Sequence, residues 1–149
     1  MHCSLSFIAL FVSNLREAEE FYKTIFDMQL IGREAQASDG LWYTLPFDKE
    51  WEDADAAGIE IGMLALRKHD FVLALFSGDR RAGQVYAVGL SMPEDEIARV
   101  SSRLPEGISA DTDLPGRLEF TDCYQISWQI SDGDEFRTAG DFANRWLVM

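Results

Sequence analysis

The stretch FIALFVSNLREAEEFYKTIF, residues 7–26, sets the architecture of the chain because it runs from an apolar strand through a polar junction into an amphipathic helix. Side chains alternate along a strand, so Phe7, Ala9 and Phe11 share one face. The other face is apolar as well, which predicts a strand covered on both sides.

The helix that follows has a clear start. Asn14 is a favourable N-cap, and Glu17 stands three residues later at the spacing of a capping box. Apolar residues then recur at helical spacing over 15–26 and form one stripe. A strand with this stripe folded against it is half of a βα unit.

The rest of the first half is rich in strand patterns. We expect strands at 29–36, 41–47, 59–67 and 71–77, with turns at 38–40 and 68–70. The charged segment 48–58 interrupts them and is interpreted as an exposed loop or insertion.

The same order of elements returns after a linker at 78–83. A strand at 84–92 precedes Pro93, which suits the first turn of a helix. Further strands are expected near 107–114, 118–122 and 124–131, with a turn at 114–117. The chain therefore reads as one α+β domain, residues 1–149, of two tandem βαβββ modules forming a cupped mixed β-sheet. Module one is 1–78, module two is 79–131, and a C-terminal tail covers 132–149.

Composition limits the partners. The chain has 149 residues and a net charge of −13, which opposes nucleic acid and anionic lipid. No apolar run approaches the roughly 20 residues of a spanning helix, and residues 5–12 fit a buried strand better than a secretory leader. Cys3 and Cys123 match neither a disulfide framework nor a zinc motif, so we expect reduced thiols in a cytoplasmic protein.

Two stretches carry a resemblance to a known superfamily. FIALFVSNLREAEEFYKTIFDMQL and LEFTDCYQISWQI resemble the opening and the closing of vicinal oxygen chelate proteins, which include glyoxalase I, extradiol dioxygenases and the fosfomycin- and bleomycin-resistance proteins. The resemblance covers residues 5 to 130. Asp27 replaces the usual glycine at the helix end, which Asp tolerates because it can adopt the left-handed conformation. The turn TDCYQ lacks the Asp-Pro-Asp-Gly of the family.

The resemblance implies a cup in which each module offers metal ligands from its first and fourth strands. The corresponding positions are Phe7, Ala74, Val85 and Ser127. A shift of register exposes only Gln84, Tyr86, Gln125 and Gln129. Because divalent ions in such sites need His nitrogens or carboxylate oxygens, we predict no metal and no cofactor.

The sequence gives little support to other candidate metal ligands or catalytic groups. The two histidines, His2 and His69, have no partner at ligand spacing, and the acidic run within 48–58 lacks the pattern of an EF-hand loop. No nucleophile with a neighbouring base is visible. Glu60, Glu119 and Asp122 are bases only if they are buried near the cup.

The cup then predicts binding of a planar or cationic small organic molecule by aromatic walls, without metal. The predicted walls are Phe7, Ala9, Phe11, Trp42, Tyr43, Phe47, Trp51, Val85, Tyr124 and Trp128. The alternatives are a metal-dependent lyase, isomerase or dioxygenase of the same superfamily with displaced ligands, and a regulatory or structural domain whose core these residues fill. The resemblance implies a homodimer. In the tail, a short helix from Asp141 would pack Phe142 and Trp146 on a sheet edge or a second subunit.

Overall fold

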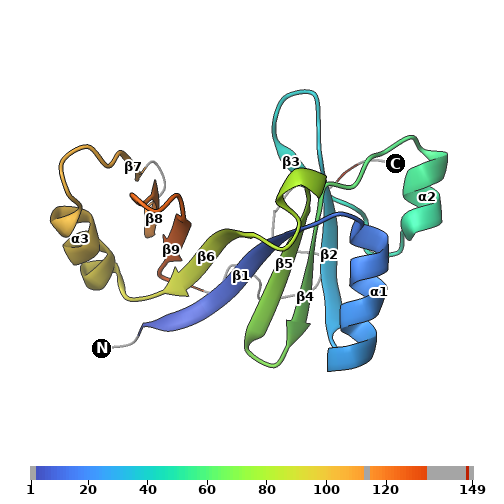
Figure 1. Ribbon diagram of the computed structural model, residues 1–149, viewed down its shortest axis with the longest axis horizontal. Helices are drawn as coiled ribbons and strands as arrows, with labels where there is room; N and C mark the ends of the chain where they lie inside the picture. The colour runs from blue at the N-terminus through green and yellow to red at the C-terminus, as the bar shows by residue number, and fades with distance from the viewer. Residues whose placement is uncertain (1–2, 113–114, 134–146, 148–149) are drawn as a thin grey trace.

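The computed structural model describes residues 3–112, 115–133 and 147 (Figure 1). The strands are β1 (Ser4–Val12), β2 (Gln29–Gln36), β3 (Trp42–Thr44), β4 (Met63–Lys68), β5 (Phe71–Ser77), β6 (Val85–Ser91), β7 (Ala110–Asp111), β8 (Arg117–Thr121) and β9 (Ser127–Ser131). The helices are α1 (Leu15–Phe26), α2 (Trp51–Ala56) and α3 (Glu94–Arg103), with a 3₁₀ turn, η1, at Asp79–Arg81. None of these helices is long and apolar enough to cross a membrane.

One sheet carries all nine strands in the order β3-β2-β4-β5-β1-β6-β9-β8-β7. The order β2-β4-β5-β1 in the first half is mirrored by β7-β8-β9-β6 in the second. In each half the first strand runs parallel to the last, β1 with β5 and β6 with β9. The predicted α+β fold of two tandem βαβββ modules is confirmed, with β3 and α2 added to the first. The module boundaries at residues 78 and 131 stay a prediction.

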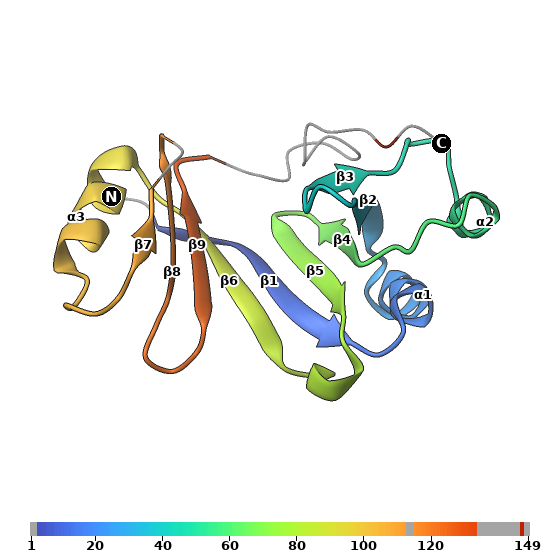
Figure 2. The ribbon, with the colours of Figure 1, turned by 90° about the horizontal axis from the view of Figure 1, so that it is seen from above.

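The sheet is curved, and Figure 2 shows α1 and α3 outside it at opposite ends. We call the face that carries the helices the outer face and the opposite one the concave face. On the outer face, Leu64, Leu66 and Leu75 are fully buried in the main core cluster, against which Ala18 and Tyr22 of α1 pack. A smaller outer cluster joins α3 to β8 and β9. The concave face has its own cluster around Phe7.

Helix α1 begins and ends as its sequence predicts. Asn14 Oδ1 accepts a hydrogen bond from the backbone N–H of Glu17 at 3.0 Å. Asp27 adopts the left-handed conformation with φ of 54°. Lys68 Nζ donates to the last helical carbonyl, that of Phe26, at 2.6 Å. The junction between β1 and α1 is thus fixed by local chemistry.

The segment 48–58 was interpreted as an exposed loop or insertion, and the structure shows that it contains the short helix α2. Asp53 Oδ2 accepts a hydrogen bond from the N–H of Glu50 at 2.8 Å, which closes the first turn. Ala54 is buried in the outer core. A six-residue helix offers too few turns for its charged sequence to show an apolar stripe, so burial of one alanine gave no signal in the sequence.

Two other predictions need adjustment. The strand expected near 107–114 is reduced to Ala110–Asp111 among the described residues, and the one at 41–47 to Trp42–Thr44. His2 and the tail helix with Phe142 and Trp146 lie outside the described residues.

A buried ion pair ties β2 to α1 and α2. Arg33 Nε and Nη2 donate to the two carboxylate oxygens of Glu19 at 2.7 and 2.9 Å, and both side chains are 5% exposed. Glu50 accepts a third bond at 3.2 Å. The guanidinium lies 5.2 Å from the ring centre of Trp51, whose Nε1 also donates to Glu19. Burial lowers the pKa of Arg33, but the hydrogen bonds and charges of Glu19 and Glu50 outweigh burial and raise it.

We expect Glu19→Ala to lower the free energy of unfolding by about 3 kcal/mol, because it leaves the Arg33 charge buried without its main partner. The measurement is the midpoint of urea unfolding. Glu52→Ala is the matched control: its carboxylate pairs with Arg16 at the surface and its loss should change little. Equal midpoints for both variants would show that the Arg33 pair contributes no more than a surface pair.

Candidate functional site

A row of small side chains crosses the middle of the concave face. Directly paired residues on neighbouring strands point to the same side of a sheet. The strand register therefore places these residues in one line: Thr121, Ser127, Ala87, Ala9, Ala74, Ala65 and Gly32. This row leaves space above the sheet, and larger side chains stand on either side of it.

Aromatic rings form one side. Tyr86 packs edge-on against Phe11 at 5.0 Å between ring centres and lies tilted against Phe76 at 4.7 Å. Trp42 meets Phe76 edge-on at 6.0 Å. The Arg81 guanidinium lies 5.4 Å from the Phe11 ring centre. We call Phe11, Trp42, Phe76 and Tyr86 the aromatic cluster. All four rings are only partly buried, and Tyr86 is 37% exposed.

Phe7 lies on the central pair of strands, where β1 meets β6. Its register partner is Gly89. A Cβ atom added to Gly89 would lie 2.2 Å from Cε1 of the Phe7 ring, a distance that no pair of carbon atoms tolerates. The ring therefore occupies the space that a side chain at position 89 would need, and Phe7 is 4% exposed. This close approach explains why β6 has a glycine in its interior.

The prediction that Val85 faces the cup is wrong. A bulge in the β1–β6 ladder pairs Leu10 with Val85, and Leu10 packs against the outer core. Val85 therefore leaves the concave face, and Tyr86 joins Ala87 in lining the cavity there. A bulge inserts one extra residue and reverses the alternation, which no residue pattern in QVYAVGLSM announces.

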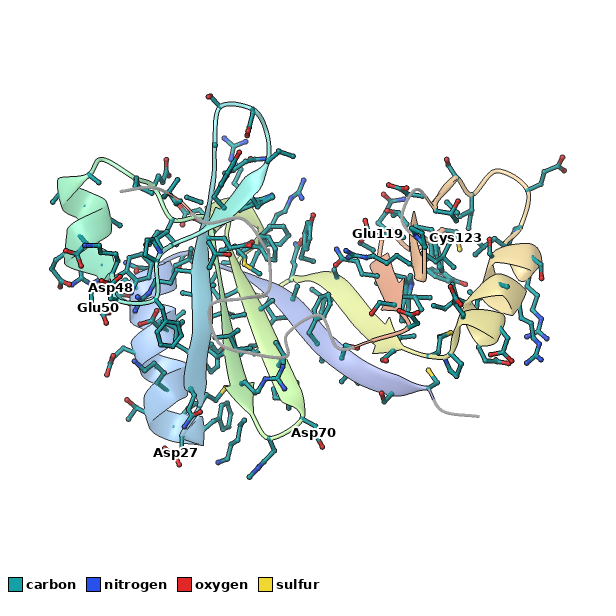
Figure 3. The ribbon with its side chains drawn as sticks, turned by 180° about the vertical axis from the view of Figure 1, so that it is seen from behind. Asp27, Asp48, Glu50, Asp70, Glu119 and Cys123 are labelled. Carbon is teal, nitrogen blue, oxygen red and sulfur yellow. The ribbon has the colours of Figure 1, made fainter. Side chains whose placement is uncertain are left out.

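The second module supplies a polar side. Asp111, Glu119 and Gln129 pair in register across β7, β8 and β9 and continue the row that contains Gly89 and Phe7. An open groove of about 430 Å³ is lined by Asp111 and Glu119 together with the hydroxyls of Ser109, Thr121 and Ser127. Figure 3 shows Glu119 on the side of β8 that faces the first module. Arg117 donates to Glu119 at 3.4 Å.

A small cavity of about 50 Å³ lies between the two sides. Phe7, Ala74, Ala87 and Gln129 line it, with Met63, Phe76 and Tyr86. It is far below the roughly 300–1,000 Å³ of a pocket that encloses a drug-sized ligand. The cavity can take a small group, while the larger part of any ligand would lie in the groove beside it.

The residues at the centre of the cup do not fit a divalent metal. Of the four positions assigned from the sequence, Phe7 and Ala74 line the central cavity, but Ala87 and Gln129 occupy the places given to Val85 and Ser127. Two alanines, a phenylalanine and a glutamine offer no imidazole or carboxylate. Within 3–112, 115–133 and 147, no group of three or more His, Cys, Asp or Glu residues could hold a metal ion. His69, considered from the sequence as a ligand, lies in the β4–β5 turn with φ of 53°.

Of the ten predicted wall residues, the structure brings Phe7, Ala9, Phe11 and Trp42 to the concave face. Tyr43 pairs with Ala35, which belongs to the outer core, and its hydroxyl donates to Asp39 at 2.7 Å.

The other predicted aromatics also lie away from the concave face. Trp51 packs with Arg33 on the outer side, and Phe47 lines a cavity there. Tyr124 is 80% exposed in the β8–β9 turn. Trp128 pairs with Phe120, on the face covered by α3, and its Nε1 donates to Asp122 at 2.9 Å.

Sequence reasoning missed Phe76, Met63 and the role of Tyr86. Phe76 is the register partner of Phe11, and both belong to strands that were predicted correctly. Pairing the first strand in parallel with the fourth would have placed Phe76 beside Phe11. The register of that pair was the missing information, because a shift of one residue turns every side chain to the other face.

No protein-family model matches the sequence, and no curated protein matches it. Among solved structures, a hypothetical protein from Bacillus halodurans C-125 is similar over 88% of this chain and 94% of its own, with 13% identity and a TM-score of 0.55. Methylmalonyl-CoA epimerase from Mycobacterium tuberculosis matches over 85% of both chains, with 15% identity and a TM-score of 0.48. The fosfomycin resistance protein FosX from Listeria monocytogenes matches 87% of this chain and 91% of its own, with 16% identity and a TM-score of 0.33.

At these identities the comparisons concern the fold alone. The similarity to the Bacillus halodurans protein supports the α+β fold with a cupped mixed sheet that the sequence predicted.

We expect Gly89→Ala to destabilise the protein by about 1–3 kcal/mol, because the added methyl overlaps the Phe7 ring and forces it to move. The cost should be smaller when the same change is made in a Phe7→Ala protein. The measurement is a double-mutant cycle by urea unfolding. A cost that is the same in both backgrounds would contradict the contact between ring and glycine.

The carboxyl group of Asp122 should make the stability of the protein depend on pH. Hydrogen bonds from Trp128, then from the backbone of Ile126 and Tyr124, lower the pKa of its carboxyl group. A lowered folded-state pKa stabilises the protein above the unfolded value of about 3.9, and this contribution is lost as pH falls through the folded value. Asp122→Asn should therefore be less stable at neutral pH and should lose less stability below about pH 4. Parallel stability curves of the two proteins across that range would refute this.

Proposed function

We propose that the protein binds a small planar or cationic organic molecule on its concave face, without a metal ion. The observation that carries the proposal is the aromatic cluster, whose four rings pack together and yet stay partly exposed on that face. Large apolar side chains gathered at a surface are characteristic of a binding site. Aromatic faces attract cations as well as planar groups.

The opposite side of the cup supports a cationic ligand. The groove there is lined by Asp111 and Glu119, and the whole chain carries a charge of −13. A field of this sign raises the local concentration of cations. Cation recognition by an aromatic surface next to carboxylates needs no metal, which agrees with the donor-poor centre of the cup.

The size of the cavity limits the mode of binding. Only a small substituent fits the space of about 50 Å³ between Phe7, Ala74 and Gln129. The ring or body of the ligand would lie over the aromatic cluster and its charged group would point along the groove. We include in the proposal a homodimer, which size-exclusion chromatography with light scattering tests. The proposal also includes a cytoplasmic location, which fractionation of the source cells tests.

The test uses benzyltrimethylammonium, a planar ring joined to a permanent cation, in isothermal titration calorimetry at low salt. We expect saturable binding that Tyr86→Ala weakens by five- to tenfold, since one exposed cation–π contact contributes about 1 kcal/mol. Glu119→Gln should weaken it in the same direction. Tyr124→Ala is the control, because Tyr124 is an exposed aromatic away from the cup.

The alternative is a metal-dependent enzyme of the same fold with displaced ligands. Elemental analysis of protein purified without chelator separates the two. A stoichiometric divalent metal, together with a rise in thermal stability on adding that ion, would overturn the metal-free proposal. Saturable binding that Tyr86→Ala leaves unchanged would move the site away from the aromatic cluster. The absence of both binding and metal would favour a structural domain with a filled cup.

A further inference from the structure

A second cavity, of about 240 Å³, lies on the outer side of the sheet between α1, β2 and the turn that precedes α2. Its position follows from register: Leu30 and Arg33 of β2 line it and pair with Leu66 and Leu64, which belong to the outer core. It is therefore separate from the concave face. Figure 3 shows Asp48 and Glu50 of the neighbouring segment close to α1.

The charge at this cavity is opposite to that of the protein. The cavity is lined by three cationic side chains, those of Lys23, Arg33 and Lys49. Two carboxylates balance part of this charge, one on Glu50 and one on Glu19, which both pair with Arg33. The chain as a whole is at −13. Three cations among the lining residues, one of them a buried guanidinium, favour an anion at this cavity.

Arg33 retains hydrogen-bonding capacity on the cavity. Its Nε and Nη2 are used by Glu19 and Glu50. Its Nη1, which carries two N–H groups, makes only one long bond among the described residues, 3.4 Å to the carbonyl of Lys49. The side chain is 5% exposed and lines the cavity, so a ligand there can reach the guanidinium. A carboxylate oxygen is the acceptor that such a donor prefers.

The remaining walls are apolar. Leu30 and Leu45 form the inner part, and Phe47 stands at the outer part in the turn closed by the Lys49 N–H to Pro46 carbonyl hydrogen bond. Phe47 is 69% exposed and is, among the residues that the structure describes, the second most exposed large apolar residue after Tyr124. A ligand in the cavity would cover this ring, and removal of apolar surface from water favours binding.

We propose that this cavity is a second binding site, for a small monocarboxylate with an aromatic or branched apolar body. The carboxylate takes the remaining donor of Arg33 and the ammonium of Lys49, and the apolar body packs between Leu45 and Phe47. A phosphate group has no apolar part for the walls formed by Leu30, Leu45 and Phe47. This proposal does not depend on the one made for the concave face.

Phenylacetate is the probe, titrated into the full chain at low salt with calorimetry and with ¹H–¹⁵N spectra. We expect 1:1 saturable binding and shifts at the amides of Phe47 and Lys49. Lys49→Met, which keeps the aliphatic stem, should weaken binding at least fivefold. Arg103→Met removes the same charge at the end of α3 and should leave affinity unchanged. Phenylacetamide, which lacks the charge, should bind at least fivefold more weakly.

The outcomes separate this site from the concave face. Weakening by Tyr86→Ala but not by Lys49→Met would place the carboxylate in the cup and overturn the proposal. Equal weakening by Lys49→Met and Arg103→Met would show that only the net charge of the protein matters, and it would overturn the proposal. Binding that does not saturate at tens of millimolar phenylacetate would overturn the proposal as well. Phe47→Ser, at an exposed turn position, gives an independent variant that should weaken binding if Lys49→Met fails to fold.

Discussion

The antiparallel pairing of β1 with β6 is the interaction on which the structure depends, because it joins the two modules into one sheet. The parallel strand of each module attaches to one side of this pair, and α1 and α3 lie on the outer face of the sheet at its opposite ends. The contact between Phe7 and Gly89 lies on this strand pair. The pair that joins the two modules therefore also fills the bottom of the cup.

This central contact shapes the chemistry of the concave face. A phenyl ring, two alanines and a glutamine around about 50 Å³ offer no imidazole or carboxylate donor for a chelated ion. What stays accessible lies further out. Aromatic rings form one side, three of them from the first module and Tyr86 from β6, and carboxylates and hydroxyls of the second module form the other side.

On the outer face of the sheet, a buried ion pair positions the candidate binding group. Arg33 is held by Glu19 and Glu50 in a network that fixes β2 against α1 and α2. Breaking a buried ion pair is costly, so its geometry is rigid. The unused donor of that rigid guanidinium borders a cavity whose walls are otherwise apolar. A structural ion pair can in this way orient a group toward a ligand.

Local sequence patterns were sufficient for the order of the elements and for most of the elements themselves, but not for α2. Alternation identified β1, Asn14 and Glu17 fixed the start of α1, and the repeated order of strands and helix indicated the duplication, because each depends on residues close together in the chain. Tertiary structure was needed for the site. The β6 bulge that removed Val85 from the cup, the pairing of Phe76 with Phe11, and the burial of Ala54 that supports α2 all depend on registers and contacts between distant segments. A strand reveals the alternation of its side chains, but its partner and register decide which face becomes the cup.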